Sequence, residues 1–257
     1  MILEYKSNPI FYSDVGSGQP VILLHGFLEN SSMWENHIPV WSKRNRIISI
    51  DLLGHGQTDC IGYIHTMEDM AEAVYTVIKH LKINNATFIG HSMGGYVALA
   101  LAEQYPTLFK GICLMNSTFE SDSVERKTIR KRAIVMAKEN YEGLVRMSFA
   151  NLFAPSSRIR FKLEYEQALQ QALKTPVQGY IAAQEGMQLR PNRFHTLKSL
   201  ECKKLLIIGK KDTLIDGEKL VSKTDDSDIE FVEFSEGHMS HIENMKELTY
   251  KINHFIE

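Results

Sequence analysis

The sequence predicts an α/β fold with a mostly parallel sheet, helices on both faces of the sheet and a helical insertion. Short apolar runs alternate with segments of helical periodicity over most of the 257 residues, a pattern typical of parallel sheets. Between about residues 119 and 200 the alternation stops, and helical patterns follow one another without a convincing strand. A hydrophobic share of 44% with 23% charged residues indicates a globular chain rather than a disordered or fibrous one.

The first two strand-like segments are short, and apolar and polar residues partly alternate in them. They are Leu3–Lys6 and Ile10–Ser13, and a glycine-rich turn at residues 16–18 follows. This pattern predicts an antiparallel hairpin at one edge of the sheet. Six apolar runs predict the remaining strands: Val21–His25, Ile47–Asp51, Ala86–Ile89, Gly111–Met115, Lys204–Ile208 and Glu230–Phe234.

Helical periodicity marks the segments between and after these strands. Asp69–Leu81 has apolar residues three and four positions apart, and Leu248–Ile256 has the pattern of a closing helix against the sheet. Four further helices are expected in the insertion: Arg130–Asn140, Glu142–Leu152, Ile159–Leu173 and Val177–Gln188.

The domain organisation follows from these elements. We predict an α/β core of residues 1–118 and 201–257, with a helical cap of residues 119–200. Prolines at positions 155 and 176 separate the helices of the cap. Such a cap would lie over the carboxyl edge of the sheet.

The residues around Ser92 carry the strongest functional signal. Gly90 and Gly94 stand two positions to either side of Ser92, after a strand-like run that ends at Ile89 and before an apolar helical segment, Tyr96–Ala102. A serine hydroxyl becomes an effective nucleophile when it stands clear of its neighbours on a tight strand-to-helix turn, which needs small residues on both sides. The segment therefore predicts a nucleophilic serine.

With this turn, the order of elements and the insertion in view, the chain resembles the α/β-hydrolase superfamily, especially its small capped serine esterases and carbon-carbon bond hydrolases. The resemblance covers nearly the whole chain and implies an α/β-hydrolase sheet with a cap, while the substrate stays open. It depends on five motifs: Leu24-His25-Gly26-Phe27, Asp51-Leu52-Leu53-Gly54-His55-Gly56, Gly90-His91-Ser92-Met93-Gly94-Gly95, Gly209-Lys210-Lys211-Asp212 and Gly237-His238-Met239-Ser240-His241.

Asp212 is the catalytic acid that this resemblance implies, because the chain order in such proteins is serine, acid, histidine. It follows the apolar strand Leu205–Ile208 by a short polar turn, so it should lie at the same sheet edge as Ser92. The alternative role for Asp212 is to cap a helix from Thr213 onward. Asp216 is the nearest competitor, although it lies further past the strand.

His238 is the expected general base, since it follows the strand Phe231–Phe234 and a short flexible turn that ends in glycine. His241 is the alternative, and its other role is to pack or cap where the closing helix begins. The expected catalytic triad is therefore Ser92, Asp212 and His238.

Hydrolysis passes through a tetrahedral oxyanion, which prepositioned backbone amides can stabilise. The resemblance implies the amides of Met93, directly after the nucleophile, and Phe27, in the loop after the third strand. His25, Asp51 and His55 are expected to stabilise the loops rather than act in catalysis, and His91 is expected to pack beside the turn that carries Ser92. No spacing of histidines fits a zinc site, so we expect neither a metal nor a cofactor.

An apolar substrate pocket is expected among six residues, although aromatic and methionine side chains at helical spacing lie more often in the core. We therefore expect no more than half of them to contact substrate. The candidates are Trp34, Tyr96, Phe119, Phe149, Phe153 and Met187.

Three functions are compatible with these residues. The first is a serine hydrolase that cleaves a small carboxylic ester through an acyl-enzyme. The second is a carbon-carbon bond hydrolase or a menaquinone-pathway lyase with the same triad, and arginines of the cap that hold a substrate carboxylate would favour it: Arg130, Arg146, Arg158 or Arg190. The third is a ligand sensor that turns over slowly.

Charge and cysteine content narrow the class further. The net charge of -2 offers no basic field for nucleic acid or membrane, and the basic cluster at residues 126–132 is expected to be a solvated helix face. Cys60, Cys113 and Cys202 indicate free thiols in a reducing compartment. With no targeting or membrane segment recognised, we expect a cytoplasmic protein that binds a small-molecule ester, and its oligomeric state stays open.

Overall fold

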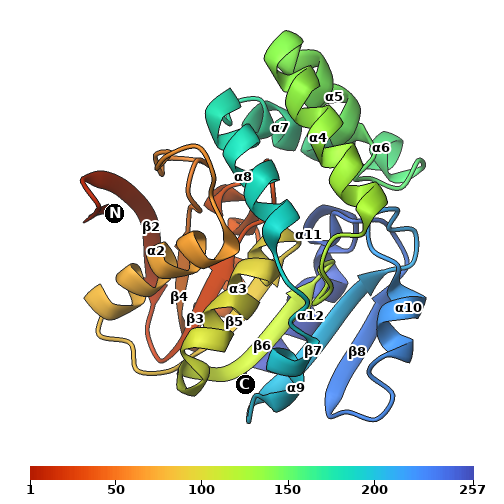
Figure 1. The fold of residues 1–257 in the computed structure, drawn as a ribbon. Coiled ribbons are helices and arrows are strands. Elements are labelled where there is room, and N and C mark those ends of the chain that lie inside the picture. Colours follow the sequence, from red (N-terminus) through yellow and green to blue (C-terminus); the bar gives the residue numbers. More distant parts are fainter.

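The computed structural model describes residues 1–257, and its strands form one sheet of eight. The strands are β1 (Ile2–Tyr5), β2 (Asn8–Gly16), β3 (Gln19–Leu24), β4 (Asn45–Ile50), β5 (Ala86–His91), β6 (Phe109–Met115), β7 (Lys203–Gly209) and β8 (Ile229–Phe234). Their order across the sheet is β1-β2-β4-β3-β5-β6-β7-β8 (Figure 1). β2 is antiparallel to both β1 and β4, and all other neighbours are parallel. The predicted fold class is confirmed.

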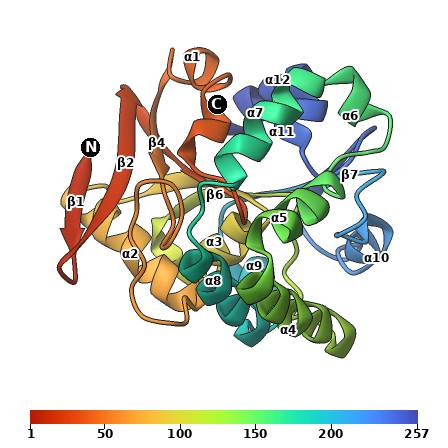
Figure 2. The same ribbon diagram turned by 90° about the horizontal axis from the view of Figure 1, so that it is seen from above.

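Helices cover both faces of this sheet. They are α1 (Ile38–Trp41), α2 (Met67–His80), α3 (Met93–Gln104), α4 (Val124–Glu139), α5 (Tyr141–Ala150), α6 (Ser157–Arg160), α7 (Lys162–Ala172), α8 (Val177–Leu189), α9 (Phe194–Ser199), α10 (Gly217–Ser222), α11 (Ser240–Glu243) and α12 (Met245–Ile256). Seen from above, α2, α3 and α9 lie on one side of the sheet, and α1 and α12 lie on the other (Figure 2).

The central strand β3 shows why both faces need cover. Ile22 and Leu24 belong to the apolar core on the side of α2 and α3, whereas Val21 and Leu23 belong to the core on the side of α1 and α12. Successive side chains of a strand point to opposite faces, so an unbroken apolar run has to be buried on both. The run at Val21–Leu24 therefore places β3 in the middle of the molecule.

Helices α4 to α8 form a cap beyond the carboxyl ends of the parallel strands (Figure 1). The cap has its own apolar cluster, which includes Ala137, Phe149, Leu169 and Tyr180. Leu28, from the loop after β3, belongs to the same cluster and joins the cap to the core. Burial of these side chains holds the cap in place over the sheet edge.

The cap helices differ from the prediction in two places. α4 begins before its expected start at Arg130, because Ser123 caps the helix by accepting a hydrogen bond from the amide of Arg126. The single helix expected over Ile159–Leu173 is two helices, α6 and α7. The backbone leaves the helical region between them at Phe161, with φ −112° and ψ 41°.

The limits of the predicted cap, residues 119 and 200, stay a prediction. Within that segment α9 packs against α3, and Leu197 of α9 belongs to the core cluster on the side of α2 and α3. None of the helices combines the length and the apolar character that a membrane crossing requires.

Candidate active site

Ser92 lies on the turn between β5 and α3, with φ 48° and ψ −113°. Residues with a side chain rarely adopt this conformation, so the turn is strained. A Cβ added at Gly90 would lie 2.5 Å from the carbonyl carbon of Gly94, and one at Gly94 would collide with the backbone of Leu24. Both glycines are therefore needed for α3 to start this close to the strands.

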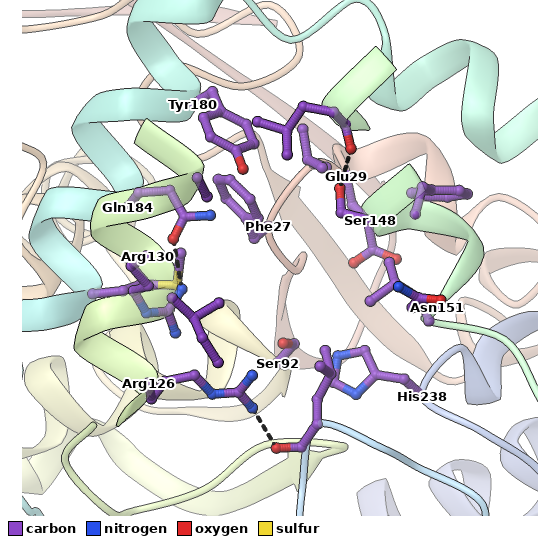
Figure 3. A pocket seen from close by; sticks show the side chains of 18 of the residues that line it. Phe27, Glu29, Ser92, Arg126, Arg130, Ser148, Asn151, Tyr180, Gln184 and His238 are labelled. Carbon is purple, nitrogen blue, oxygen red and sulfur yellow. Dashed lines mark hydrogen bonds between the residues drawn. The ribbon is translucent and has the colours of Figure 1, made fainter. Parts of the chain in front are cut away.

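His238 and Asp212 contact each other at the carboxyl ends of β8 and β7. The Nδ1 atom of His238 donates to Oδ2 of Asp212 at 2.7 Å, and both side chains are buried. This bond fixes the orientation of the imidazole ring and leaves its Nε2 atom free. Ser92 and His238 line the same cavity, and Figure 3 shows their side chains next to each other.

Several donors surround the carboxylate of Asp212. The amides of Leu214 and Ile215 donate to Oδ1, at 2.8 and 3.2 Å, and Asn116 donates to Oδ2 at 3.1 Å. Burial raises the pKa of Asp212, but the charge and hydrogen bond of His238 and these donors outweigh it and lower the pKa below its ordinary value. Asp212 is therefore an anion suited to stabilise an imidazolium.

The two competing residues have other contacts. Asp216 is exposed and caps α10, where its side chain accepts a hydrogen bond from the amide of Lys219. His241 lies outside the cavity of Ser92, with Nε2 3.6 Å from a carboxylate oxygen of Glu29. Burial lowers the pKa of His241 to about 3. The geometry favours Asp212 and His238 for the triad.

The cavity that holds Ser92 has a volume of about 480 Å³ and lies between the sheet edge and the cap. Figure 3 shows Phe27 and Tyr180 on its upper wall, with Ser148 and Asn151 from the cap on the right. Fifteen of its twenty-five lining residues are hydrophobic, so the site is largely apolar. A low-polarity site strengthens electrostatic interactions with a reacting group.

Three of the six expected pocket residues line this cavity, namely Tyr96, Phe149 and Met187. The other three do not. Trp34 packs on the far face of the sheet in the core around α12, Phe119 packs against Phe194, and Phe153 packs inside the cap cluster. Helical periodicity identified side chains that are buried, but it did not show whether each one lines the cavity or packs in an apolar core.

The residues expected to form the oxyanion hole flank Ser92. Phe27 lines the cavity, and its amide has no acceptor within the protein. Met93 is the first residue of α3, where backbone amides have no partner inside the helix and the helix dipole is positive. Leu28 has a positive φ of 63°, which shapes the loop that carries Phe27.

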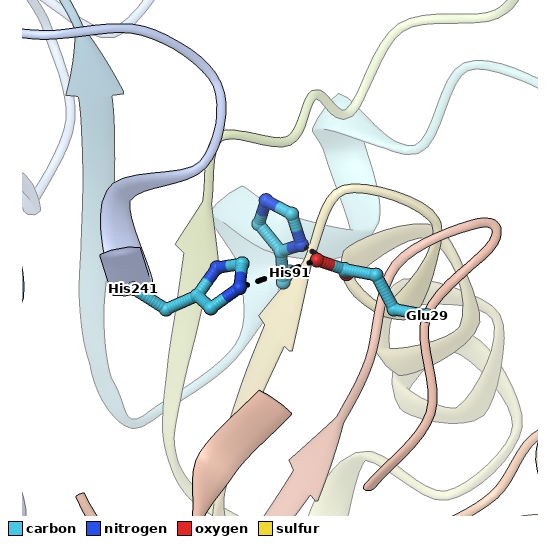
Figure 4. A group of neighbouring side chains, drawn as sticks. All are labelled: Glu29, His91 and His241. Atoms are coloured by element: carbon cyan, nitrogen blue, oxygen red, sulfur yellow. Dashed lines mark hydrogen bonds and ion pairs between the residues drawn. The ribbon is translucent and has the colours of Figure 1, made fainter. Parts of the chain in front are cut away.

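Glu29, His91 and His241 form a buried cluster beside the candidate catalytic residues (Figure 4). Glu29 accepts from His91 Nδ1 at 2.6 Å and from the Gly26 amide at 2.7 Å, and His91 Nε2 donates to the carbonyl of His238 at 3.0 Å. Burial raises the pKa of Glu29, but His91 and His241 outweigh it and lower the pKa to about 2. For His91 burial lowers the pKa, and Glu29 outweighs it and raises the pKa.

The same three side chains are spaced closely enough to be considered as metal ligands. A metal needs a deprotonated nitrogen from each histidine. The raised pKa of His91 and its two hydrogen bonds instead describe a protonated ring paired with Glu29. The donor set therefore fits an ion pair better than a metal site. No motif or spacing in the sequence pointed to Glu29 as a residue of this site.

The remaining polar residues of the motifs contact the loops around the site. His25 Nε2 accepts from the amide of Leu52 at 2.8 Å, and the carboxylate of Asp51 accepts from the amides of Ser31 and Gln57. Burial lowers the pKa of His55 to about 3, which favours a neutral ring. These contacts agree with loop-stabilising roles.

The basic cluster of α4 is not a wholly solvated face, contrary to expectation. Arg126, Arg130 and Arg132 line the cavity, while Lys127 and Lys131 are exposed. The prediction was wrong because α4 belongs to the cap and one of its faces lies over Ser92. The composition of the segment does not show where the helix packs. The helical spacing of Arg126 and Arg130, one turn apart, was the available signal.

The other cap arginines named from the sequence do not line the cavity. Arg146 pairs with Glu142 on the surface of α5, and Arg158 is exposed. Arg190 is buried, where it pairs with Asp122 at 2.8 Å and covers the ring of Tyr96 at 4.0 Å. Of these arginines only Arg130 reaches the cavity.

A mostly parallel sheet with a serine on the turn after β5 is the architecture that the sequence motifs imply. A model of the alpha/beta hydrolase fold family matches residues 19–245. The chain belongs to this family.

Two curated relatives match shorter segments. The (E)-2-((N-methylformamido)methylene)succinate hydrolase of Acinetobacter baylyi is 27% identical over 122 residues, which is 48% of this chain and 46% of the relative. The AB hydrolase superfamily protein YisY of Bacillus subtilis is 40% identical over 91 residues, 35% of this chain and 34% of the relative. The matches therefore span less than half the length of these relatives.

Solved structures match over almost the whole chain. A thermophilic esterase from Thermogutta terrifontis, determined with malate bound, has a TM-score of 0.89 at 28% identity, covering 96% of this chain and 92% of that one. The enol-lactonase from Burkholderia xenovorans has a TM-score of 0.91 at 21% identity and covers 99% of both chains. The second likeness is one of fold alone.

Proposed function

We propose that the chain is a serine hydrolase that cleaves a small carboxylic ester through an acyl-enzyme. The 2.7 Å bond between His238 and Asp212 carries this proposal, because it orients an imidazole in the cavity that Ser92 lines. The likeness to the Thermogutta terrifontis esterase supports the same reaction class.

In the proposed reaction the hydroxyl of Ser92 attacks the ester carbonyl while Nε2 of His238 takes its proton. The amides of Phe27 and Met93 would donate to the oxyanion. The intermediate collapses as the ester C–O bond breaks, and His238 gives its proton to the departing alcohol. Water, deprotonated by His238, then attacks the acyl-enzyme and releases the acid and the free serine. Asp212 stabilises the imidazolium in both steps.

The test uses p-nitrophenyl acetate and butyrate with the purified protein. We expect a burst of about one equivalent of p-nitrophenol per active site, followed by slower turnover, the kinetic sign of an acyl-enzyme. Ser92→Ala should lower kcat at least about 10,000-fold, and Ser121→Ala, at an exposed serine, should leave it unchanged. Absence of turnover with both esters would contradict an esterase.

A fluorophosphonate probe separates a hydrolase from a slow ligand sensor. The probe should label Ser92 rapidly if the serine is activated, and Ser92→Ala should abolish labelling. A protein that binds esters but resists the probe would behave as a sensor.

Carbon-carbon bond hydrolysis is the second candidate, and the arginines of α4 in the cavity favour it. Arg126 and Arg130 could hold an acidic substrate such as a vinylogous diketone with a carboxylate. A panel that pairs such diketones with simple esters would distinguish the two, because a carbon-carbon bond hydrolase should prefer the diketones.

A further inference from the structure

One wall of the cavity is cationic. Arg126 and Arg130 lie one helical turn apart on α4, and Figure 3 shows both side chains on the same side of the cavity, to the left of Ser92. The guanidinium of Arg126 donates a hydrogen bond from Nη2 to the backbone carbonyl of Leu214 at 2.6 Å. This guanidinium takes part in none of the ion pairs of the protein. Its positive charge is therefore not neutralised by the protein.

The charge of Arg130 is only partly neutralised. Its Nε atom lies 2.5 Å from Asp122, but Arg190 pairs with the same carboxylate at 2.8 Å. Two guanidinium groups thus share one carboxylate and leave one positive charge in excess. Gln184 accepts from Nη1 of Arg130 at 2.8 Å and fixes the direction of the guanidinium plane.

The opposite charge is scarce on the cavity wall. Glu29 is the carboxylate among the lining residues, and its ion pair with His91 neutralises it. Most of the remaining wall is apolar. In such surroundings the attraction between an arginine and an anion is stronger than in water, and a guanidinium matches the two oxygens of a carboxylate.

We propose that Arg126 and Arg130 form a carboxylate subsite, so that the preferred substrate is an ester that also carries a carboxylate, such as a half-ester of a dicarboxylic acid. The carboxylate would bind under α4 while the ester carbonyl lies at Ser92. Water is consumed, the ester C–O bond breaks, and the products are the alcohol, the dicarboxylate and one proton. Hydrolysis of the bound ester at Ser92 rests on the proposed function, whereas binding of the carboxylate does not.

The kinetic test compares monomethyl succinate with methyl valerate, a neutral ester of similar length, by titration of the released acid. The wild-type protein should show at least about tenfold higher kcat/KM for monomethyl succinate, and added salt should reduce the preference. Arg126→Gln should lower kcat/KM for monomethyl succinate by about 10- to 100-fold and lower that for methyl valerate much less, so that the preference for the acidic ester is lost.

Two further variants control for folding and for general charge. Arg126→Lys keeps the charge but not the two-pronged geometry, so it should recover part of the preference. Lys127→Gln removes a neighbouring exposed charge of the same helix and should change neither ester. The subsite would be overturned if the wild-type protein had the same kcat/KM for both esters. It would also be overturned if Lys127→Gln and Arg126→Gln lost the same factor of kcat/KM for monomethyl succinate.

A binding measurement makes the subsite testable without turnover. Calorimetry with succinate should detect binding to Ser92→Ala and an affinity about tenfold or more lower in Ser92→Ala/Arg126→Gln. If succinate binds in this arginine-dependent way and no ester is hydrolysed, the subsite stands and the proposed hydrolase fails. If both esters are hydrolysed and succinate does not bind, the hydrolase stands and the subsite fails.

Discussion

Glu29 and His91 form a buried ion pair, 2.6 Å between carboxylate and Nδ1, that touches three loops of the candidate active site. Glu29 accepts from the Gly26 amide in the loop that carries Phe27, and His91 donates to the carbonyl of His238. His91 also directly precedes the candidate nucleophile. The pair is therefore placed to position the expected oxyanion loop, the serine and the base at once.

Glu29→Gln should impair both stability and catalysis. Removing one charge of a buried pair leaves the other without compensation, so we expect the free energy of unfolding to fall by about 3 kcal/mol. Because the loops around Ser92 would lose a shared anchor, kcat should fall about 10- to 100-fold at a temperature where the variant is folded. Urea unfolding and ester kinetics measure the two effects.

The pH dependence of this loss distinguishes the ion pair from a packing effect. The lowered pKa of Glu29 stabilises the fold above its ordinary value of 4.5, and the raised pKa of His91 does so below its ordinary value of 6.5. The cost of Glu29→Gln should thus be greatest between these values and decline as pH rises through the raised pKa of His91. Glu35→Gln, at an exposed position, is the control, and a cost independent of pH would contradict the ion pair.

Asp212→Asn should abolish most activity while keeping the shape of the site. The amide donates where the carboxylate accepts, so it would favour the wrong tautomer of His238, and kcat should fall about 10,000-fold. Asp216→Asn is the matched control, because asparagine also caps helices and α10 should be preserved. Equal activity of the two variants would show that another residue orients the base.

Much of the fold and of the candidate site could be predicted from local patterns. The apolar run at Val21–Leu24 specifies a strand buried on both faces, and the spacing of Gly90, Ser92 and Gly94 specifies a turn with almost no room. Asp212 could be placed because it closely follows a strand. These features depend on residues that are near one another in the chain.

The parts that could not be predicted depend on how distant segments meet. Tyr96 and Phe119 have similar apolar character, but only Tyr96 faces the cavity. The sequence predicts a solvated Arg126, whereas in the structure α4 lies over Ser92 and Arg126 lines the cavity. The side chain of Glu29 gained its role from His91, 62 positions away in the sequence. Periodicity shows that a side chain is buried or exposed but not what it meets.

Acid should destabilise the protein before its carboxylates titrate. Burial lowers the pKa of His37 to about 4 and that of His55 and His241 to about 3. Below the ordinary value of 6.5 the unfolded chain binds protons that these rings do not take up in the folded protein, so the free energy of unfolding falls as pH falls. We expect a loss of about 1 kcal/mol per histidine between pH 7 and 5.5.

Urea unfolding over this pH range checks the prediction. His37→Gln should reduce the slope of stability against pH by about one proton, and His195→Gln, at an exposed position, should leave it unchanged. A flat profile between pH 7 and 5.5 would mean that the buried rings are already protonated in the fold.

The conformation of Ser92 predicts a difference between two inactive variants. At φ 48° and ψ −113°, alanine keeps the strain of the turn, whereas glycine adopts the conformation without it. Strain relief should exceed the greater flexibility that glycine gives the unfolded chain, so Ser92→Gly should be more stable than Ser92→Ala by about 1 kcal/mol. Ala100→Gly, in the middle of α3, should instead lower stability by at least about 1 kcal/mol. If urea unfolding finds Ser92→Gly less stable than Ser92→Ala, the turn holds no strain and serine is accommodated there at no cost to the fold.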